Sequence, residues 1–314
     1  MIKGVLTGIV AGAAMLAAGA AVAEDWAPPG PLKVQIGFGA GGSTDSLGRV
    51  LAQTMKEQTG WDVIAENKPG GGGVAMFTGI SKMPPRGSVI GIGVNMPIMI
   101  NLVLRGDELQ FNLDDFDYLG TVARAQLSII AKGDAPFDDI AGLVAYSKEN
   151  DGAPVAFDAK PQELILQAIN TESDAGLRPV STESSAEMVK LVLGGQVVAG
   201  FAAGAHQQYL ETGELKVIAS ANDSRLSYAP DVGTVREQGY GVYVDPWFFL
   251  AAPAGLDPAA REALTKAVAD AIASPAMAEV VANILKTEVD NVGPEGTKEM
   301  LVNGVDNVKV LFGK

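Results

Sequence analysis

The segment Phe38-Gly39-Ala40-Gly41-Gly42-Ser43-Thr44-Asp45 indicates the fold more clearly than any other part of this 314-residue sequence. Before it, apolar residues at 32, 34, 36 and 38 alternate with other residues, which is the pattern of a β-strand. After it, apolar residues from Leu47 to Met55 recur at helical spacing, and Gly60 ends this predicted helix. A strand, a glycine loop and a helix therefore follow one another, with Ser43 or Thr44 as the expected helix cap.

The composition of this loop suits an anion. Its glycines let the backbone approach a ligand, its N–H groups lie at a helix N-terminus, and the Ser43 and Thr44 hydroxyls are hydrogen-bond donors. The alternative is that the loop only makes a tight turn. Nucleotide binding is not predicted, because the Gly-Lys-Ser/Thr ending of a P-loop and the dinucleotide glycine spacing are both missing. For Asp45, stabilisation of the helix end is favoured over a role as general base.

The alternation of strands and helices continues along the chain. It predicts a parallel sheet with ligand sites at the carboxyl ends of its strands, and a second α/β lobe. We expect a turn at Asn95-Met96-Pro97, a helix opening at Asp257-Pro258 and only short helices after that. Strands are expected over 62–65, 89–94, 127–131, 155–157, 197–201, 215–219 and 247–252, and further helices over 74–82, 140–148 and 186–193.

Residues 1–23 have the three parts of a secretory signal: Lys3, an apolar run over 4–20, and Ala21-Val22-Ala23 before the expected cleavage point. The apolar run is short for a membrane span of about 20 residues, which disfavours the alternative of a retained anchor. Cysteine is absent, so disulfides, metal thiolates and a cysteine nucleophile are excluded. An exported protein without disulfides suits the periplasm.

The chain is acidic. Its formal charge is −14, and removal of residues 1–23, whose only charge is Lys3, leaves −15 (−14 − 1). Such a surface repels nucleic acid and anionic lipid, but not a small carboxylate, because exposed charges are screened over roughly 8–10 Å. The single histidine, His206, has no partner for a Ser/His/Asp or multi-histidine metal site. We therefore expect no catalytic residues, no metal and no cofactor.

Several segments in one order resemble the Bug/TctC family, the periplasmic receptors of tripartite tricarboxylate transporters. They cover nearly all of the mature chain and are together far more specific than any one of them. They are residues 38–45 with the following helix, Glu-Asn-Lys-Pro-Gly-Gly-Gly-Gly at 66–73, Phe-Asn-Leu-Asp-Asp-Phe at 111–116, Leu-Gly-Gly-Gln-Val at 193–197, Thr-Gly-Glu-Leu-Lys at 212–216, and 247–255.

The resemblance implies a type II periplasmic-binding-protein fold, an α/β fold in which two lobes are joined by crossing hinge strands and close on a ligand in the cleft. Lobe 1 would be residues 24–123 and 246–314, and lobe 2 residues 124–245. In the family the loop matching 39–45 cradles a ligand carboxylate through backbone N–H groups and water. The ligand-binding residues that it implies here are Phe38, Ala40, Gly41, Gly42, Ser43, Thr44, Asp45 and Asn95 in lobe 1, and Asp158, Lys160, Ser184 and Ser185 in lobe 2.

The second lobe departs from the family's pattern. Residues 158–162 read Asp-Ala-Lys-Pro-Gln, 182–184 read Thr-Glu-Ser and 201–203 read Phe-Ala-Ala, where relatives carry other residues. The wall that distinguishes ligands is therefore expected to be rebuilt. Lys160 either pairs with a second ligand carboxylate or is solvated, and Ser184 and Ser185 bind ligand, cap a helix, or both. Glu183, if it faces the cleft, would favour a ligand with an amine or hydroxyl.

The function implied is a monomeric receptor that captures a C4–C6 dicarboxylate, a tricarboxylate or an aromatic acid and delivers it to the membrane subunits of a tripartite tricarboxylate transporter. A receptor that passes ligand binding to a sensor kinase is the alternative. An enzyme on the same fold is the least expected, because no nucleophile–base or metal constellation is visible.

Overall fold

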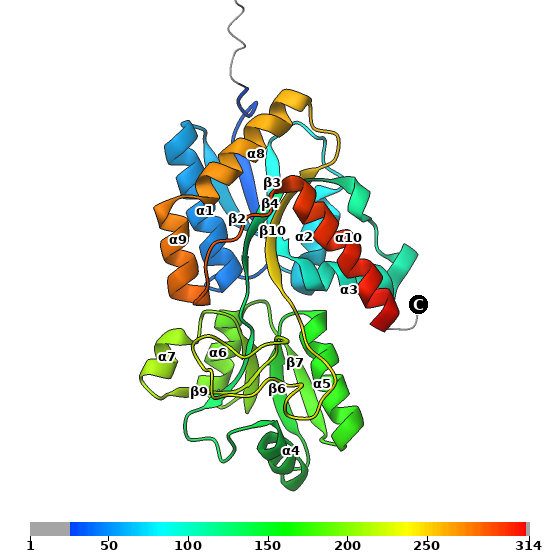
Figure 1. The fold of residues 1–314 in the computed structure, drawn as a ribbon, viewed down its shortest axis with the longest axis vertical. Coiled ribbons are helices and arrows are strands. Elements are labelled where there is room, and N and C mark those ends of the chain that lie inside the picture. Colours follow the sequence, from blue (N-terminus) through cyan, green and yellow to red (C-terminus); the bar gives the residue numbers. More distant parts are fainter. Residues whose placement is uncertain (1–25, 312–314) are drawn as a thin grey trace, which may run out of the picture.

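The computed structural model describes residues 26–311 and confirms two α/β lobes, which are stacked end to end (Figure 1). The predicted signal peptide lies outside the described residues. We call lobe 1 the part around the five-stranded sheet β2-β1-β3-β10-β4, and lobe 2 the part around the five-stranded sheet β7-β6-β8-β5-β9.

Lobe 1 contains both ends of the described chain. Its strands are β1 (Leu32–Ile36), β2 (Val63–Asn67), β3 (Val89–Val94), β4 (Phe116–Arg124) and β10 (Trp247–Pro253). Its helices are α1 (Ser43–Thr59), α2 (Val74–Ile80), α3 (Asn95–Arg105), α8 (Pro258–Ile272), α9 (Pro275–Val280) and α10 (Gly293–Leu311), with short turns of helix at η1 (Gly71–Gly73), η2 (Gly106–Glu108), η3 (Leu113–Asp115) and η4 (Val281–Leu285).

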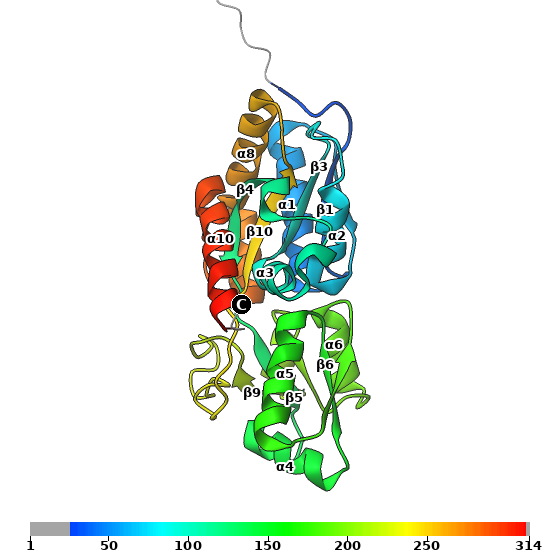
Figure 2. The ribbon, with the colours of Figure 1, turned by 90° about the vertical axis from the view of Figure 1, so that its right-hand side faces the viewer.

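Lobe 2 is a continuous stretch of chain between β4 and β10. Its strands are β5 (Ser128–Lys132), β6 (Ala153–Phe157), β7 (Leu177–Ser181), β8 (Ala199–Ala202) and β9 (Leu215–Ser220), and its helices are α4 (Ile140–Glu149), α5 (Lys160–Ser173), α6 (Ser185–Leu193) and α7 (Gln207–Glu211). Seen from the side, the chain passes between the lobes in two extended segments (Figure 2).

The prediction of a parallel sheet is correct only for part of each lobe. Strands β2-β1-β3 and β7-β6-β8 are parallel, but β10 runs antiparallel to β3 and β4, and β5 runs antiparallel to β8 and β9. The reason is the path between the lobes: β4 leads the chain out of lobe 1 and β10 brings it back beside β4. Likewise β5 enters lobe 2 from the cleft, whereas β6 and β8 end there.

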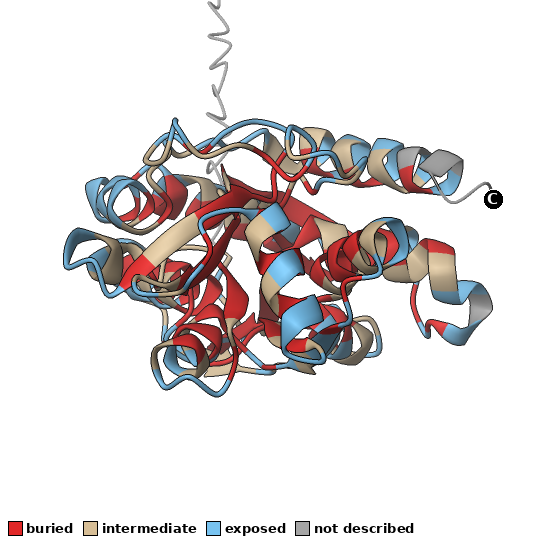
Figure 3. Cartoon of the chain, turned by 90° about the horizontal axis from the view of Figure 1, so that it is seen from below, coloured by how far each residue is buried: buried red, intermediate tan, exposed pale blue. Residues whose placement is uncertain are grey.

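Each lobe is held by its own apolar core. Buried residues line the strands and the inner faces of the helices, while the outer helix faces are exposed (Figure 3). On α1 the predicted apolar stripe is confirmed, because Leu47, Leu51 and Met55 are fully buried against the sheet of lobe 1. Within residues 26–311 no single helix is long and apolar enough to span a bilayer; α8 and the helix after it reach that length and composition only as a pair bent by 54°.

Several local expectations were wrong. Asn95-Met96-Pro97 opens α3 instead of forming a turn, because a proline in the first helical turn loses no intrahelical hydrogen bond. The cap of α1 is Gly42, with extended backbone, so Ser43 and Thr44 are the first helical residues. The described residues end in a 19-residue helix, α10, rather than in short helices. The cap at Asp257 is confirmed, since its side chain accepts a hydrogen bond from Ala259 N–H.

Candidate ligand-binding cleft

A cavity lies between the lobes, with an empty volume of about 600 Å³ that includes its opening to solvent. Lobe 1 lines it with Phe38, Gly42, Ser43, Thr44, Val94, Met96, Pro97 and Phe248; lobe 2 with Leu127, Asp158, Ala159, Pro161, Gln162, Ser184, Ser185, Met188 and Ala203; and the crossing segments with Ala125, Val244 and Pro246.

Four helices point their N-terminal turns at this cavity. Ser43 and Thr44 begin α1, Met96 and Pro97 begin α3, Pro161 and Gln162 begin α5, and Ser185 begins α6. The first N–H groups of a helix have no intrahelical acceptor, and the macrodipole makes this end partly positive. Among the described residues that line the cavity there is no lysine, arginine or histidine. Pro97 and Pro161 have no N–H, Met96 N–H is bonded to Asn95 Oδ1 and Gln162 N–H to Ala159 C=O. The backbone N–H donors at the cavity therefore come from α1 and α6, and the dipoles of all four helices add positive potential.

The hydroxyls of Ser43 and Thr44 add free donors to this cavity. Both residues are buried, and neither hydroxyl has a hydrogen-bond partner among the described residues. Ser185 Oγ accepts a hydrogen bond from Ala203 N–H at 3.2 Å, and Ser184 Oγ accepts one from Glu187 N–H at 3.3 Å as the cap of α6. A serine hydroxyl that accepts one bond still has its proton to donate.

Asp45 belongs to the structure of the loop and does not line the cavity. Its carboxylate accepts hydrogen bonds from Gly41 N–H at 2.9 Å, Arg49 Nε at 2.9 Å and Asn67 Nδ2 at 2.8 Å. Burial raises its pKa, but these three bonds and the charge of Arg49 together hold the pKa of Asp45 below its usual value. The carboxylate therefore stays ionised and fixes the shape of the glycine loop.

The glycine loop touches lobe 2 directly. Gly39 N–H donates a hydrogen bond to Glu183 C=O at 2.8 Å, and a Cβ on Gly39 would lie 3.2 Å from Glu183 Cβ. A Cβ on Gly41, whose φ is +84°, would lie 3.3 Å from Ala186 Cβ, and Ala40 beside it is exposed. The lobes are therefore in contact across the cleft, and this contact depends on the absence of side chains at the glycines.

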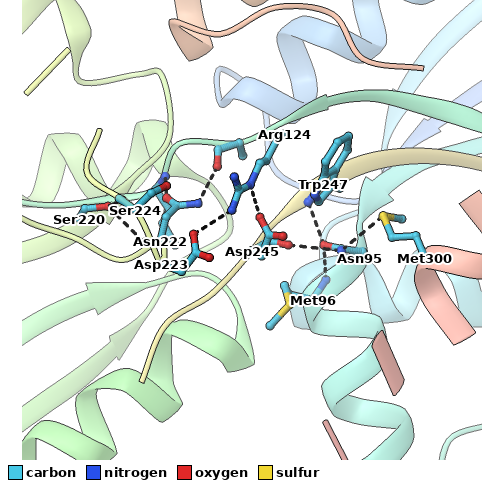
Figure 4. A network of polar contacts seen from close by, with 12 residues as sticks. Asn95, Met96, Arg124, Ser220, Asn222, Asp223, Ser224, Asp245, Trp247 and Met300 are labelled. Carbon is cyan, nitrogen blue, oxygen red and sulfur yellow. Dashed lines mark hydrogen bonds and ion pairs between the residues drawn. The ribbon is translucent and has the colours of Figure 1, made fainter. Parts of the chain in front are cut away.

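Asn95 is buried at the hinge rather than in the cavity lining (Figure 4). Its side-chain oxygen accepts hydrogen bonds from Met96 N–H at 2.7 Å and Trp247 N–H at 2.8 Å. Asp245 lies between Asn95 and Arg124, and Arg124 pairs with Asp245 and, at 2.9 Å, with Asp223. Asn95 therefore ties the start of α3 to the strand that returns from lobe 2.

The two crossing segments are also joined to each other. Ala125 N–H donates to Pro246 C=O at 2.7 Å, and the buried Asn222 side chain accepts from Leu127 N–H at 2.7 Å and donates to Ala125 C=O at 3.0 Å. These hinge contacts were not predicted from the sequence, because their partners lie about a hundred residues apart.

Of Asp158 and Lys160, only Asp158 lines this cavity. Asp158 lines the cavity and forms a reciprocal pair with Gln162: its N–H donates to Gln162 Oε1 at 2.8 Å, and Gln162 Nε2 donates to its Oδ1 at 2.7 Å. Burial raises the pKa of Asp158 to about 6. Lys160 is paired with Glu163 at 2.8 Å. It borders a neighbouring cavity, which Asp158 and the exposed Glu183 also line.

Sequence reasoning missed much of the apolar lining. Met96, Met188, Val244 and Pro246 line the cavity, but in the sequence such residues are indistinguishable from core. The sequence did not identify Gln162 as a lining residue either. His206 lies buried outside this lining; it hydrogen-bonds Ser128 Oγ at 3.2 Å and Tyr228 Oη at 3.0 Å, and burial lowers its pKa to about 3, so it is neutral.

Comparison with known proteins agrees with this architecture. The sequence model described as tripartite tricarboxylate transporter family receptor matches residues 47–305. BugT of Bordetella pertussis is 28% identical over 270 residues, which are 84% of this chain and 82% of BugT. The structure of the periplasmic binding protein BugD is similar with a TM-score of 0.80 and 26% identity, over 91% of this chain and 98% of BugD.

A second similar structure is MatC from Rhodopseudomonas palustris, solved with bound malate. It has a TM-score of 0.78 and 20% identity, over 90% of this chain and 98% of MatC. At that identity the similarity supports only a shared fold. The expected periplasmic-binding-protein fold is confirmed.

Proposed function

This chain belongs to the tripartite tricarboxylate transporter receptor family, and from that premise we propose that it captures a small organic carboxylate between its lobes and delivers it to the membrane subunits of such a transporter. It is a solute-binding protein of the Bug/TctC type. We propose that it acts in the periplasm, as a monomer and without a cofactor, after residues 1–23 have been removed.

One observation carries the proposal: the dipoles of four helix N-termini, the first N–H groups of α1 and α6, and two unpartnered hydroxyls converge on a cavity whose described lining contains no basic side chain. A carboxylate is the group that such donors stabilise, because it accepts several N–H and O–H bonds at once. The helix dipoles supply the positive potential without a cation, which suits reversible capture.

We propose different roles for the residues implied by the resemblance. The seven that line the cavity would contact the ligand: Phe38, Gly42, Ser43, Thr44, Asp158, Ser184 and Ser185. Ala40, Gly41 and Asp45 would shape the loop, and Asn95 would hold the hinge. Lys160 would stay with Glu163 outside the ligand's reach.

The mechanism follows from the placement of these groups on both lobes. A ligand that contacts α1 on one side and α5 or α6 on the other favours the closed state, because only the closed state makes both sets of contacts. We propose that residues 24–123 with 246–314 and residues 124–245 are the bodies that rotate. The candidate ligands are a C4–C6 dicarboxylate, a tricarboxylate or an aromatic acid, and the role is binding rather than catalysis; MatC, with the same fold, holds malate.

A thermal-shift screen of the mature protein against organic acids tests this function. An acid present at a hundred times its Kd stabilises the folded state by about 2.7 kcal/mol, which raises the Tm by roughly 4–8 °C. The double variant Ser43→Ala/Thr44→Val should lose this shift. Thr171→Val is the matched control, since it removes an exposed hydroxyl on α5.

Two results would contradict the proposal. The first is a screen in which no carboxylate raises the Tm while sugars or peptides do. The second is a double variant whose Tm rises with the acid as much as that of the Thr171→Val control, which would remove Ser43 and Thr44 from the site.

A further inference from the structure

We infer that Asp158 makes this cleft selective for a carboxylate that also bears a protonated amine, with the amine placed against the Asp158 side chain. This inference rests on the proposed function and names the ligand class more closely. It concerns lobe 2, where the sequence departs from the family's pattern.

Asp158 is the only ionisable residue among the described residues that line the cavity. The nearest lysine in the sequence, Lys160, is paired with Glu163 and borders the neighbouring cavity. Asp158 also borders that neighbouring cavity, where its charged neighbours are Lys160, Glu163 and the exposed Glu183. No ion pair joins Asp158 to another described residue, so its charge has no counterpart in the protein.

The carboxylate of Asp158 is held in place by hydrogen bonds, but not all of its capacity to accept hydrogen bonds is taken. The reciprocal pair with Gln162 occupies its backbone N–H and Oδ1, and Gln162 is itself buried. The carboxylate also interacts with its own backbone N–H, and Oδ2 has no hydrogen-bond partner in another described residue. A rigid acceptor with a free oxygen at a cavity wall is preorganised for a donor on the ligand.

Asp158 is partly buried, and even partial burial of an unpaired charge is unfavourable; the raised pKa of Asp158 reflects this cost. A ligand ammonium removes the cost because it supplies the missing opposite charge. A second ligand carboxylate at the same place does the reverse, since two like charges cannot both stay ionised close together. The ligand then has two distinct ends: a carboxylate at the first turn of α1 and an ammonium at Asp158.

Isothermal titration calorimetry at neutral pH tests this with three series of straight-chain acids of matching length: ω-amino monocarboxylates, plain monocarboxylates and dicarboxylates. In the wild-type protein the tightest ω-amino acid should bind about tenfold or more tighter than the plain acid and the dicarboxylate of its length. Asp158→Asn, which keeps the shape and the Gln162 contact, should abolish this preference. Glu183→Gln, which neutralises an exposed carboxylate outside the cavity lining, should keep it.

The inference is overturned if dicarboxylates or plain acids bind wild-type protein as tightly as the ω-amino acids, if no ω-amino acid binds, or if Asp158→Asn leaves the order of affinities unchanged. A protein that prefers dicarboxylates would refute the role of Asp158 and leave the receptor function intact. A protein that binds no carboxylate in the thermal-shift screen would refute the receptor function itself.

Discussion

Replacement of Gly39 by valine should hold the lobes apart without unfolding either of them. Gly39 is buried against lobe 2, where an added Cβ would lie 3.2 Å from both Glu183 Cβ and Glu183 C=O and 3.3 Å from Ser184 Cβ. Its φ lies outside the positive range, so the substitution carries no backbone strain of its own. Opening the hinge relieves the crowding, so the ligand-free Tm should change little.

The magnitude follows from two contributions. Overpacking costs about 1–3 kcal/mol, and loss of the Gly39 N–H bond to Glu183 C=O costs about 1 kcal/mol. Together they cost the closed state about 2–4 kcal/mol relative to the open state, so the Kd rises by roughly 30- to 700-fold. Calorimetry with the acid that shifts the Tm most gives the Kd, and small-angle X-ray scattering with saturating acid should show a variant that stays more extended than the wild type.

Gly79→Ala is the matched control, because nothing lies within 4 Å of a Cβ at that position in α2. It should bind and close like the wild type. A Gly39→Val protein with wild-type affinity and a wild-type compaction on binding would refute the reasoning that closure of the lobes requires this glycine.

Three further predictions concern residues that act at a distance from the ligand or through their charge. Asp45→Ala leaves Gly41 N–H and two side chains without their acceptor, so urea unfolding should show a loss of about 1–3 kcal/mol even without ligand; an unchanged midpoint would contradict its role in the loop. Asn95→Ala removes the acceptor of Trp247 N–H, so the ligand-free protein should lose about 1–3 kcal/mol and show a broader distribution of lobe separations by scattering. Burial raises the pKa of Asp158 from 3.8 to about 6, so the folded state favours the neutral carboxyl. The stability that this neutral carboxyl contributes is fully present below pH 3.8 and is lost as the pH rises through about 6. Asp158→Asn should therefore stabilise the ligand-free protein by up to about 2 kcal/mol at pH 7.5, as measured by urea unfolding, with no gain near pH 4.

Much of the fold was accessible from local patterns. The strand, glycine loop and helix over 32–60, the cap at Asp257 and most other strands appear within a residue or two of their predicted positions, because spacing and capping act between near neighbours. Elements without a clear period were missed: β4, β7 and α5 were not predicted, and α3 was read as a turn. The direction of β10 and β5 depends on how the chain crosses between lobes, which no local pattern records.

The candidate site, like the fold, was predictable from the sequence only in part. The sequence by itself determined that residues 38–45 offer glycines, hydroxyls and a helix N-terminus, and that the chain belongs with the tripartite tricarboxylate transporter receptors. Only the tertiary structure decided that Ser43 and Thr44 face the cavity while Asp45 turns into the loop, and that Asn95 holds Trp247, 152 residues away. Helical and strand patterns arise from interactions between near neighbours, whereas a cleft is made by residues that become neighbours only when both lobes have folded.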